Sequence, residues 1–396
     1  MSALCSLLKL PENERKERGL LYTPAEIAQQ PETWKKTFEL FQRQRAEIHE
    51  FLAMAGVWAP DVASRPTVML IGAGTSDYIG QSVARLLRKT WQCDVTAVPS
   101  TDLLTEMESV LLPGRRHLCI SFSRSGDSAE GVAVMQKVLA IRPDILHLVV
   151  SCNVNGWMVK GTEAYPQVLR VCLDDAVNDR GLAMTSSFSN MVILGQCLAH
   201  SCDLPMYEKI FRKVVSGGRN FLPLAADCAA RLAQLSLTKA CMVGSGPLRA
   251  VARESALKVL ELTAGKTLTL SESALGLRHG PMAALDESTL FVCFLSGNPT
   301  VQKYEMDLLR ELGRKGLVNN RVVVSGQALS GAGSLAEHFL LPSAGSPVAD
   351  DYRPAVDVIF GQLLGLFFSL KWGLQPDNPS PTGAISRVVQ NVTIHA

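Results

Sequence analysis

The sequence of 396 residues lacks the usual marks of a membrane, secreted or nucleic-acid-binding protein. Its most apolar run, 358–370, is interrupted by Gln362 and is shorter than the roughly 20 apolar residues that cross a bilayer. The first residues include no basic segment followed by a long apolar region. A net charge of +2 without long basic runs predicts a small partner and no nucleic acid. We therefore expect a cytoplasmic protein that does not bind membranes.

Paired cysteine motifs are also missing. Ten cysteines are scattered along the chain, and none of them forms Cys-x-x-Cys. Several lie inside apolar segments, among them Cys119, Cys241 and Cys293, where a free cysteine behaves as a small hydrophobic residue. We expect reduced thiols in the core and no metal site.

The chain does contain an internal repeat. The segment Gly72-Ala-Gly-Thr-Ser76 follows an apolar strand pattern, and Gly244-Ser-Gly246 follows a similar one 172 positions later. A second apolar strand ends at Ser123, and its counterpart ends at Ser296, 173 positions later. An apolar content of 47% is sufficient for two domains of about 100–200 residues each. The near-constant offset predicts a duplicated domain.

Apolar segments of strand length alternate with helical patterns through most of the chain. This alternation predicts an α/β fold, in which each of two domains has a parallel sheet flanked by helices in three layers. The expected strands are 67–72, 94–98, 118–122, 146–150, 168–172, 240–244, 267–270, 290–295, 321–324 and 338–341. The expected helices include 76–89, 128–141, 185–201, 353–371 and a helical connector near 206–235. We expect a helical lead-in at 1–56, domains at 57–205 and 206–375, and a tail at 376–396.

Two loops of the first copy have the composition of an anion site. Gly72-Ala-Gly-Thr-Ser76 and Ser123-Arg-Ser-Gly-Asp-Ser128 each connect a strand to a helix, and they offer hydroxyls and backbone N–H groups at a helix N-terminus. In a parallel sheet both loops lie at the carboxyl ends of the strands, where ligands bind. Ordinary turns and helix caps use the same residue types, but two such loops in one sheet favour a phosphate site. The predicted phosphate ligands are Thr75, Ser76, Ser123, Arg124, Ser125 and Ser128.

A nucleotide is a poorer match to these loops. A dinucleotide fingerprint requires a third glycine where the chain has Asp77, and no acidic residue clearly ends the next strand near Val98. Neither glycine pair is followed by the Gly-Lys-Ser/Thr of a Walker loop. We expect a phosphate ester.

The second copy carries titratable residues. The helix after Gly246 has Glu254, Lys258 and Glu261 on one narrow stripe, and its opposite face is expected to lie against the core. That opposite face consists of Ala252, Ala256 and Val259. The same spacing is common in solvated ion pairs, so this alternative stays open. Downstream, His279 lies in a tight turn between Arg278 and Gly280-Pro281, and a single histidine is often structural.

Together these motifs resemble the tandem sugar isomerase (SIS) domains of the isomerase half of glucosamine-6-phosphate synthase. From about residue 24 to the end, the chain is more similar to the bacterial galactosamine-6-phosphate deaminase/isomerase family, also called tagatose-6-phosphate ketose/aldose isomerases. The closer likeness rests on four further segments, 99–102, 179–187, 252–266 and 386–390.

The resemblance implies a role for each matching residue. The serine loops hold a sugar phosphate, Glu261 moves a proton between C1 and C2, and His279 opens the sugar ring. Lys258 and Glu254 support the open chain. In the synthase relatives the histidine comes from the neighbouring subunit, so a homodimer with shared active sites, or a larger oligomer, is implied. Further candidate substrate contacts are Gly74, Thr185 and Arg387.

The implied reaction converts D-galactosamine 6-phosphate and water to D-tagatose 6-phosphate and ammonia, and needs no metal or redox cofactor. The synthase's glutaminase half has no counterpart in about 60 leading residues and position 2 is Ser, which favours ammonia release. Arg387 stands where the synthase relatives have a lysine, and an arginine cannot form a Schiff base. Three alternatives stay open: isomerisation without deamination, glucosamine 6-phosphate as the substrate, and a non-catalytic sugar-phosphate sensor.

Overall fold

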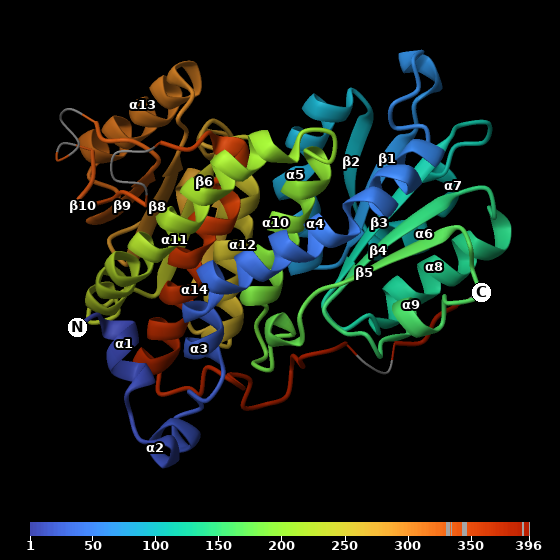
Figure 1. The fold of residues 1–396 in the computed structure, drawn as a ribbon. Coiled ribbons are helices and arrows are strands. Elements are labelled where there is room, and N and C mark those ends of the chain that lie inside the picture. Colours follow the sequence, from blue (N-terminus) through green and yellow to red (C-terminus); the bar gives the residue numbers. More distant parts are fainter. Residues whose placement is uncertain (330–332, 334, 343–346, 390–391, 396) are drawn as a thin grey trace. The chain divides into compact units, whose positions relative to one another are not determined.

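The computed structural model describes residues 1–396 except 330–332, 334, 343–346, 390–391 and 396 (Figure 1). The chain forms two compact units, each built from three stretches of sequence. The first-sheet unit contains Glu32–Asn178, Ser186–Glu208 and Ser386–Ala396. The second-sheet unit contains Met1–Pro31, Asp179–Thr185 and Lys209–Ile385. The domain limits expected at 56, 205 and 375 stay predictions.

The first-sheet unit is built around five parallel strands in the order β2-β1-β3-β4-β5. The strands are β1 (Thr67–Gly72), β2 (Asp94–Pro99), β3 (His117–Ser123), β4 (Leu146–Ser151) and β5 (Val168–Cys172). The helices are most of α4 (Gln30–Met54), then α5 (Thr75–Trp91), α6 (Ser100–Thr105), α7 (Met107–Val110), α8 (Ala129–Ile141), α9 (Trp157–Lys160) and α10 (Ser186–Ala199). Buried residues of α6, α7 and α8 pack with β1 and β3 on one face of the sheet.

The second-sheet unit repeats this order, as β7-β6-β8-β9-β10. Its strands are β6 (Lys239–Gly244), β7 (Leu268–Glu272), β8 (Thr289–Leu295), β9 (Asn320–Ser325) and β10 (His338–Leu340). Its helices are α1 (Ala3–Leu8), α2 (Glu12–Glu17), α3 (Thr23–Ala28), most of α11 (Leu204–Leu232), α12 (Pro247–Leu262), α13 (Pro299–Lys315) and α14 (Pro354–Lys371). The predicted α/β class with two helix-flanked parallel sheets is confirmed (Figure 1).

Backbone geometry at the first strand-to-helix turn supports the duplication. Gly74 has φ 55° and ψ −122°, and Gly246 has φ 57° and ψ −130°, a left-handed conformation that favours glycine. The preceding glycines allow close approach of strand and helix, since a Cβ on Gly72 or Gly244 would lie 2.4 or 2.3 Å from backbone atoms of the helix. The two copies therefore share a turn, not merely a strand order.

The apolar run noted in the sequence lies in α14, which is a core helix. Of the part of the chain that the structure describes, α14 is the one helix long and apolar enough to cross a membrane, and 89% of it is buried inside the protein. Gly361 and Gly365 let α14 lie close to α12, because a Cβ there would come within 2.2 Å of Ser255 Oγ or 2.8 Å of the Lys258 carbonyl oxygen. Thus α14 positions the helix that carries the predicted catalytic residues.

The ten cysteines are free, and seven of them are buried. Burial raises the pKa of the Cys119 and Cys241 thiols to about 12, so these thiols remain protonated at neutral pH. They act as small apolar core residues, as the sequence predicted.

Candidate active site

Two serine-rich loops lie at the carboxyl ends of the neighbouring strands β1 and β3. Ser123 Oγ accepts the N–H of Gly126 at 3.0 Å, and Ser125 Oγ accepts the N–H of Asp127 at 3.1 Å. These bonds turn the loop 123–128 before α8 begins. The structure therefore brings the two loops of the predicted phosphate site to one edge of the first sheet.

The ends of α5 and α8 nearest the loops provide hydrogen-bond donors. Thr75 and Ser76, both buried, are the first residues of α5, and Gly74 is its N-cap. Ser128 is the N-cap residue of α8 in an extended conformation, and its side chain makes no capping hydrogen bond. Because the first N–H groups of a helix have no partner within the helix, both ends are suited to an anion.

The titratable residues of the second-sheet unit form an ionic network on α12. Lys258 Nζ lies 2.6 Å from Glu261 Oε2 and 3.4 Å from Glu254 Oε1. The side chains of Lys258 and Glu254 are 1% and 0% exposed, so the alternative of a solvated ion pair is wrong. The opposite face, including Ala252 and Val259, is also buried, as predicted.

Glu261 differs from its two neighbours because its side chain is 24% exposed. Burial lowers the pKa of the Lys258 ammonium, but Glu254 and Glu261 raise it by more, so it lies above its ordinary value. Lys258 therefore stays charged at neutral pH. The network places one accessible carboxylate beside a fixed positive charge, an arrangement able to accept a proton and to balance a negative charge that forms nearby.

His279 follows the short helix η3 (Gly276–Arg278) and precedes Gly280, whose φ is 124°. Its imidazole is exposed, and within the described residues the ring makes no hydrogen bond or ion pair. The preceding Arg278 is held by Glu311, with Nε 2.8 Å from Oε2. The turn is therefore anchored beside a histidine ring that remains available.

Known proteins agree with these features. No protein-family model matches the chain. It is 37% identical over 384 residues to an AgaS protein of Streptomyces coelicolor, covering 95% of this chain and 96% of that protein. It is 33% identical over 376 residues to the D-galactosamine-6-phosphate deaminase AgaS of Escherichia coli, covering 94% and 95%. The chain belongs to the AgaS family.

Solved structures agree with this membership. The tagatose-6-phosphate ketose/aldose isomerase of Escherichia coli matches the AgaS-family chain with a TM-score of 0.85 and 30% identity, over 94% of this chain and 96% of that one. The C-terminal domain of a glucosamine-fructose-6-phosphate aminotransferase from Francisella tularensis matches with a TM-score of 0.69 at 17% identity, covering 89% and 96%. The second likeness concerns the fold alone. The family resemblance inferred from the sequence is confirmed.

The AgaS-family tail is attached to the serine loop. The Arg124 guanidinium, which is buried, donates to the backbone carbonyl of Arg387. The Arg387 guanidinium in turn donates to Asn178, at 2.7 Å to Oδ1 and 3.3 Å to the carbonyl. Arg387 thus anchors the tail in the first-sheet unit. Its direct contact with substrate stays a prediction.

The loop 123–128 is supported by residues that sequence analysis missed. Asn153 Nδ2 donates to the Ser125 carbonyl at 2.8 Å. Asp127 Oδ1 accepts the N–H of Trp157 at 2.7 Å. Asp127 stands inside the quoted serine motif, and Asn153 follows the end of the next strand, so both had a positional signal.

Thr185, a predicted substrate contact, lies in the second-sheet unit. It is fully buried, and both its N–H and its hydroxyl donate to Asp179, at 2.8 and 3.1 Å. Glu26 of α3 accepts the N–H groups of Arg180 and Gly181, at 2.5 and 3.3 Å. Burial and repulsion from Asp179 raise the pKa of Glu26 to about 8, although the two N–H groups lower it. The N-terminal helix α3 therefore holds the segment that carries Thr185.

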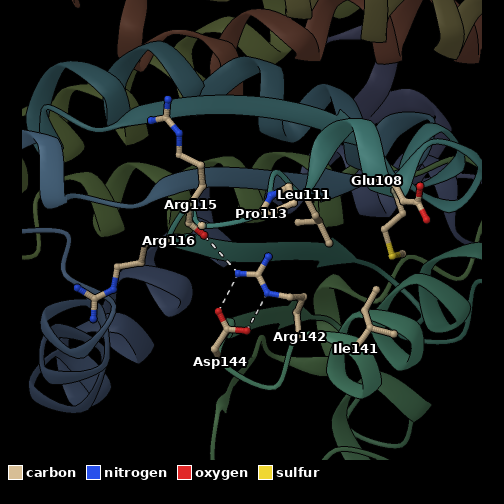
Figure 2. Close-up of a pocket in the computed structure, with 10 residues that line it drawn as sticks. Glu108, Leu111, Pro113, Arg115, Arg116, Ile141, Arg142 and Asp144 are labelled. Atoms are coloured by element: carbon tan, nitrogen blue, oxygen red, sulfur yellow. Dashed lines mark hydrogen bonds and ion pairs between the residues drawn. The ribbon is translucent and has the colours of Figure 1, made fainter.

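The first-sheet unit also has a cavity of about 890 Å³, whose lining residues are drawn in Figure 2. Its lining residues precede β3 and β4 in the chain, so the cavity lies at the amino ends of these strands, whereas the serine loops lie at the carboxyl ends. Arg142 in its wall donates twice to Asp144, at 2.8 and 2.7 Å, and once to the Arg115 carbonyl, at 3.3 Å (Figure 2). Ligands of parallel sheets bind at the carboxyl ends of the strands, so this cavity is distinct from the predicted site.

Proposed function

We propose that this AgaS-family protein converts D-galactosamine 6-phosphate and water to D-tagatose 6-phosphate and ammonia. The proposal rests above all on the network of α12, in which Lys258 lies between buried Glu254 and accessible Glu261. A non-catalytic sensor has no need of a charged network whose burial is costly. Family membership supports the same reaction, since the Escherichia coli relative is a D-galactosamine-6-phosphate deaminase.

In this proposal the serine loops bind the phosphate of the substrate. The N–H end of each helix, α5 and α8, would face the phosphate, and the hydroxyls of Ser125 and Ser128 would add donors. Arg124 contributes a positive charge that the tail holds in place. Binding the non-reacting phosphate end fixes the sugar for the chemistry at C1 and C2.

The chemistry begins when His279 protonates the ring oxygen and the C1 hydroxyl loses its proton, which gives the open-chain aldehyde. Glu261 then takes the proton from C2 and returns it at C1, and Lys258 balances the charge of the enolate-like intermediate. The resulting ketose imine adds water at C2, and the C2–N bond breaks to release ammonia. Glu254 keeps Lys258 charged throughout.

A complete site requires the serine loops, the α12 network and His279 around one hexose phosphate. We propose that these groups act on one substrate, in a cytoplasmic homodimer whose partner subunit supplies the histidine. The exposure of the His279 ring supports this role. A variant of His279 mixed with an inactive variant of Glu261 would recover activity if the sites are shared between subunits.

Isomerisation without loss of nitrogen is the second candidate, because the Escherichia coli structure is that of a tagatose-6-phosphate ketose/aldose isomerase. The two reactions share the proton transfer and differ in the group at C2. The test is to supply galactosamine 6-phosphate, glucosamine 6-phosphate and tagatose 6-phosphate separately, and to measure ammonia and aldose phosphate. Ammonia from galactosamine 6-phosphate supports the proposal. Turnover of tagatose 6-phosphate to an aldose, without ammonia from either amino sugar, would refute it.

A further inference from the structure

The second sheet has the same two loops as the first, but their donors are used differently. Gly246 and Gly74 have almost the same φ and ψ, and Ser296 stands 173 positions after Ser123. If the copies had kept one chemistry, neither sheet would have carboxylates bonded to these loops. In the second-sheet unit the donors are instead bonded to the protein's own carboxylates.

Two carboxylates of the same unit occupy the loop that follows β8. Asp350 Oδ2 accepts the hydroxyl of Ser296 at 2.5 Å, and Asp350 Oδ1 accepts the N–H of Gly297 at 2.8 Å. Glu305 Oε2 accepts the N–H of Ser296 at 2.7 Å. Burial raises the pKa of Glu305 to about 7, and interactions with Ser245 and with the Ser296 N–H lower it. Thus each of the two loops of the second sheet contacts a carboxylate.

A buried cation balances this negative charge. Arg353 Nη1 lies 3.0 Å from Asp350 Oδ1 and donates to the Leu295 carbonyl at 2.7 Å. Arg353 Nη2 donates to Asp357 at 2.7 Å. A guanidinium between a strand end and an anion is the pairing by which proteins bind phosphate, except that here the anion is a side chain.

Other substitutions remove or occupy donors at the helix ends of this unit. Pro247 begins α12 where the first copy has Thr75, so one N–H and one hydroxyl are missing. Asn298 caps α13 by accepting the N–H groups of Thr300 and Val301, at 3.0 and 3.3 Å. In the first copy Ser125, which matches Asn298 under the offset of 173, accepts one N–H, that of Asp127 at 3.1 Å.

We infer that the loops of the second sheet are a phosphate-type anion site sealed by the protein's own carboxylates. Asp350 serves as the internal ligand of Ser296, Gly297 and Arg353, and Glu305 satisfies the N–H at the strand end. The first copy has Val132 at the position of Glu305 under the same offset of 173, so its loop lacks this acid. The inference depends on the second-sheet unit alone and would hold if the proposed reaction were wrong.

Replacing the internal ligand tests this directly. Asp350→Ala removes the carboxylate but keeps Ser296, Gly297 and Arg353, so inorganic phosphate should take its place. Asp350→Ser, which is smaller than Asp and polar, is a second variant should the alanine protein fold poorly. Asp350→Asn keeps the shape and the acceptor oxygen, and Asp307→Ala removes an exposed acid of α13. Bound phosphate per chain is measured by calorimetric titration, and the Tm of each protein is measured with and without phosphate.

The expected result is one additional phosphate per chain in the Ala and Ser variants relative to the natural protein, with a larger phosphate-dependent rise in Tm. The Asn and Asp307 variants should match the natural protein. Adding Arg353→Gln to Asp350→Ala should abolish the gain. Because the readout is a difference, it holds whether or not the first copy binds phosphate. Folded Ala and Ser variants that bind no additional phosphate would overturn the inference.

Discussion

The helices α5 and α12 occupy equivalent positions in the two copies but differ in the side chains that they bury. Both begin after a left-handed glycine, and both pack mainly on the equivalent pair of strands, β1 and β2 for α5 and β6 and β7 for α12. With the offset of 172, Glu254 and Lys258 of α12 correspond to Ser82 and Leu86 of α5, and all four are buried. In α5 the Ser82 hydroxyl returns to its own helix, donating to the Tyr78 carbonyl at 2.7 Å.

This difference shows how a duplicated fold can divide its chemistry. In the first copy, among the residues that the structure describes, no carboxylate contact occupies Ser123, Ser125 or Ser128 of the loop after β3, and the buried face of α5 has Ser82 and Leu86 where α12 has charges. In the second copy carboxylates accept hydrogen bonds from the loops, and the buried face of the helix carries an ion network. Burying two charges is costly unless they are paired, so such a network is expected where chemistry requires it. Five experiments test this division: the first four run from the largest expected effect to the smallest, and the fifth depends on pH.

Removing the accessible carboxylate of α12 should have the largest effect. Glu261→Gln keeps the size of the side chain but cannot accept the C2 proton, so kcat should fall about 10³-fold with little change in KM. The rate of ammonia release at different concentrations of galactosamine 6-phosphate gives kcat and KM. Glu287→Gln, at an exposed position of the same unit, is the control and should be fully active. Full activity of Glu261→Gln would show that the base lies elsewhere.

Removing the buried cation should destabilise the second copy in a way that the first copy does not share. Lys258→Met takes away the ammonium that balances Glu254, which should cost about 3–5 kcal/mol of unfolding free energy. Leu86→Met at the matching position of α5 should cost less than about 1.5 kcal/mol. Urea unfolding measures both. Adding Glu254→Gln to Lys258→Met should recover part of the loss, and equal costs for the two methionine variants would contradict the argument.

The two copies can also be compared by how tightly their helices pack, because α14 lies in close contact with α12. In Gly361→Ala the new Cβ would lie 2.6 Å from the backbone Cα of Ser255, so we expect a loss of about 1–3 kcal/mol. In Gly195→Ala of α10 the three nearest atoms are side-chain atoms of Val83, at 2.8–3.2 Å, and none of them is a backbone atom. The first variant should therefore have the lower Tm. Similar Tm values would show that α12 can shift without cost.

The loops after β3 and β8 can be compared directly, because the first is proposed to bind phosphate and the second is bonded to Asp350. Ser125→Ala should raise KM about tenfold while kcat changes little, because a hydrogen bond to a charged phosphate is lost. Ser296→Ala should leave KM unchanged and lower the Tm, because its hydroxyl bonds to Asp350 inside the protein. Steady-state kinetics and thermal unfolding separate the two. A raised KM for Ser296→Ala with unchanged Tm would reverse the assignment of the copies.

The last experiment depends on pH and contrasts an acid held by N–H groups with the acids of α12. The pKa of Glu26 is about 8 in the folded protein, above its ordinary value of 4.5. The folded chain therefore keeps a proton that the unfolded chain releases, and this group's contribution to stability falls as pH rises from about 4.5 to 8. Glu26→Gln should remove that fall, so the variant should gain stability over the natural protein between pH 5 and 8.

Urea unfolding across that pH range measures the difference between the two proteins. Asp179 and Asp377, whose charges raise the pKa of Glu26, are present in both proteins. Parallel stability curves would show that Glu26 does not titrate in this range.

Much of the fold was predictable because its signals are local. Runs of buried Val, Ile, Leu and Cys located the ten strands to within a few residues. The helix α13 was not predicted, although Asn298 and Pro299 at its start and Gly316 at its end are ordinary helix signals. Its many charged residues leave a narrow apolar stripe, formed by Leu308, Leu309 and Leu312, which gives weaker evidence than the apolar strands.

The candidate site was predictable in its members but not in their surroundings. The spacing of Glu254, Lys258 and Glu261 puts them on one stripe in any helix, yet spacing cannot distinguish a solvated pair from a buried one. The ion pair is buried because α14, which lies more than 90 residues further along the chain, covers α12. Likewise, the motif around Arg387 indicated a substrate contact, whereas the bonds to Arg124 and Asn178 depend on chain segments more than 200 residues away.

The sequence by itself determined the duplication, the two parallel sheets, the serine loops and the family, because repeats, apolar periodicity and glycine turns are properties of neighbouring residues. Tertiary structure alone decided which charges are buried and which donors are occupied. Asp350 lies 54 residues from Ser296, and no local pattern links them. A carboxylate in an anion site and a carboxylate in solvent look the same in a sequence, because the difference depends on which distant groups surround the charge.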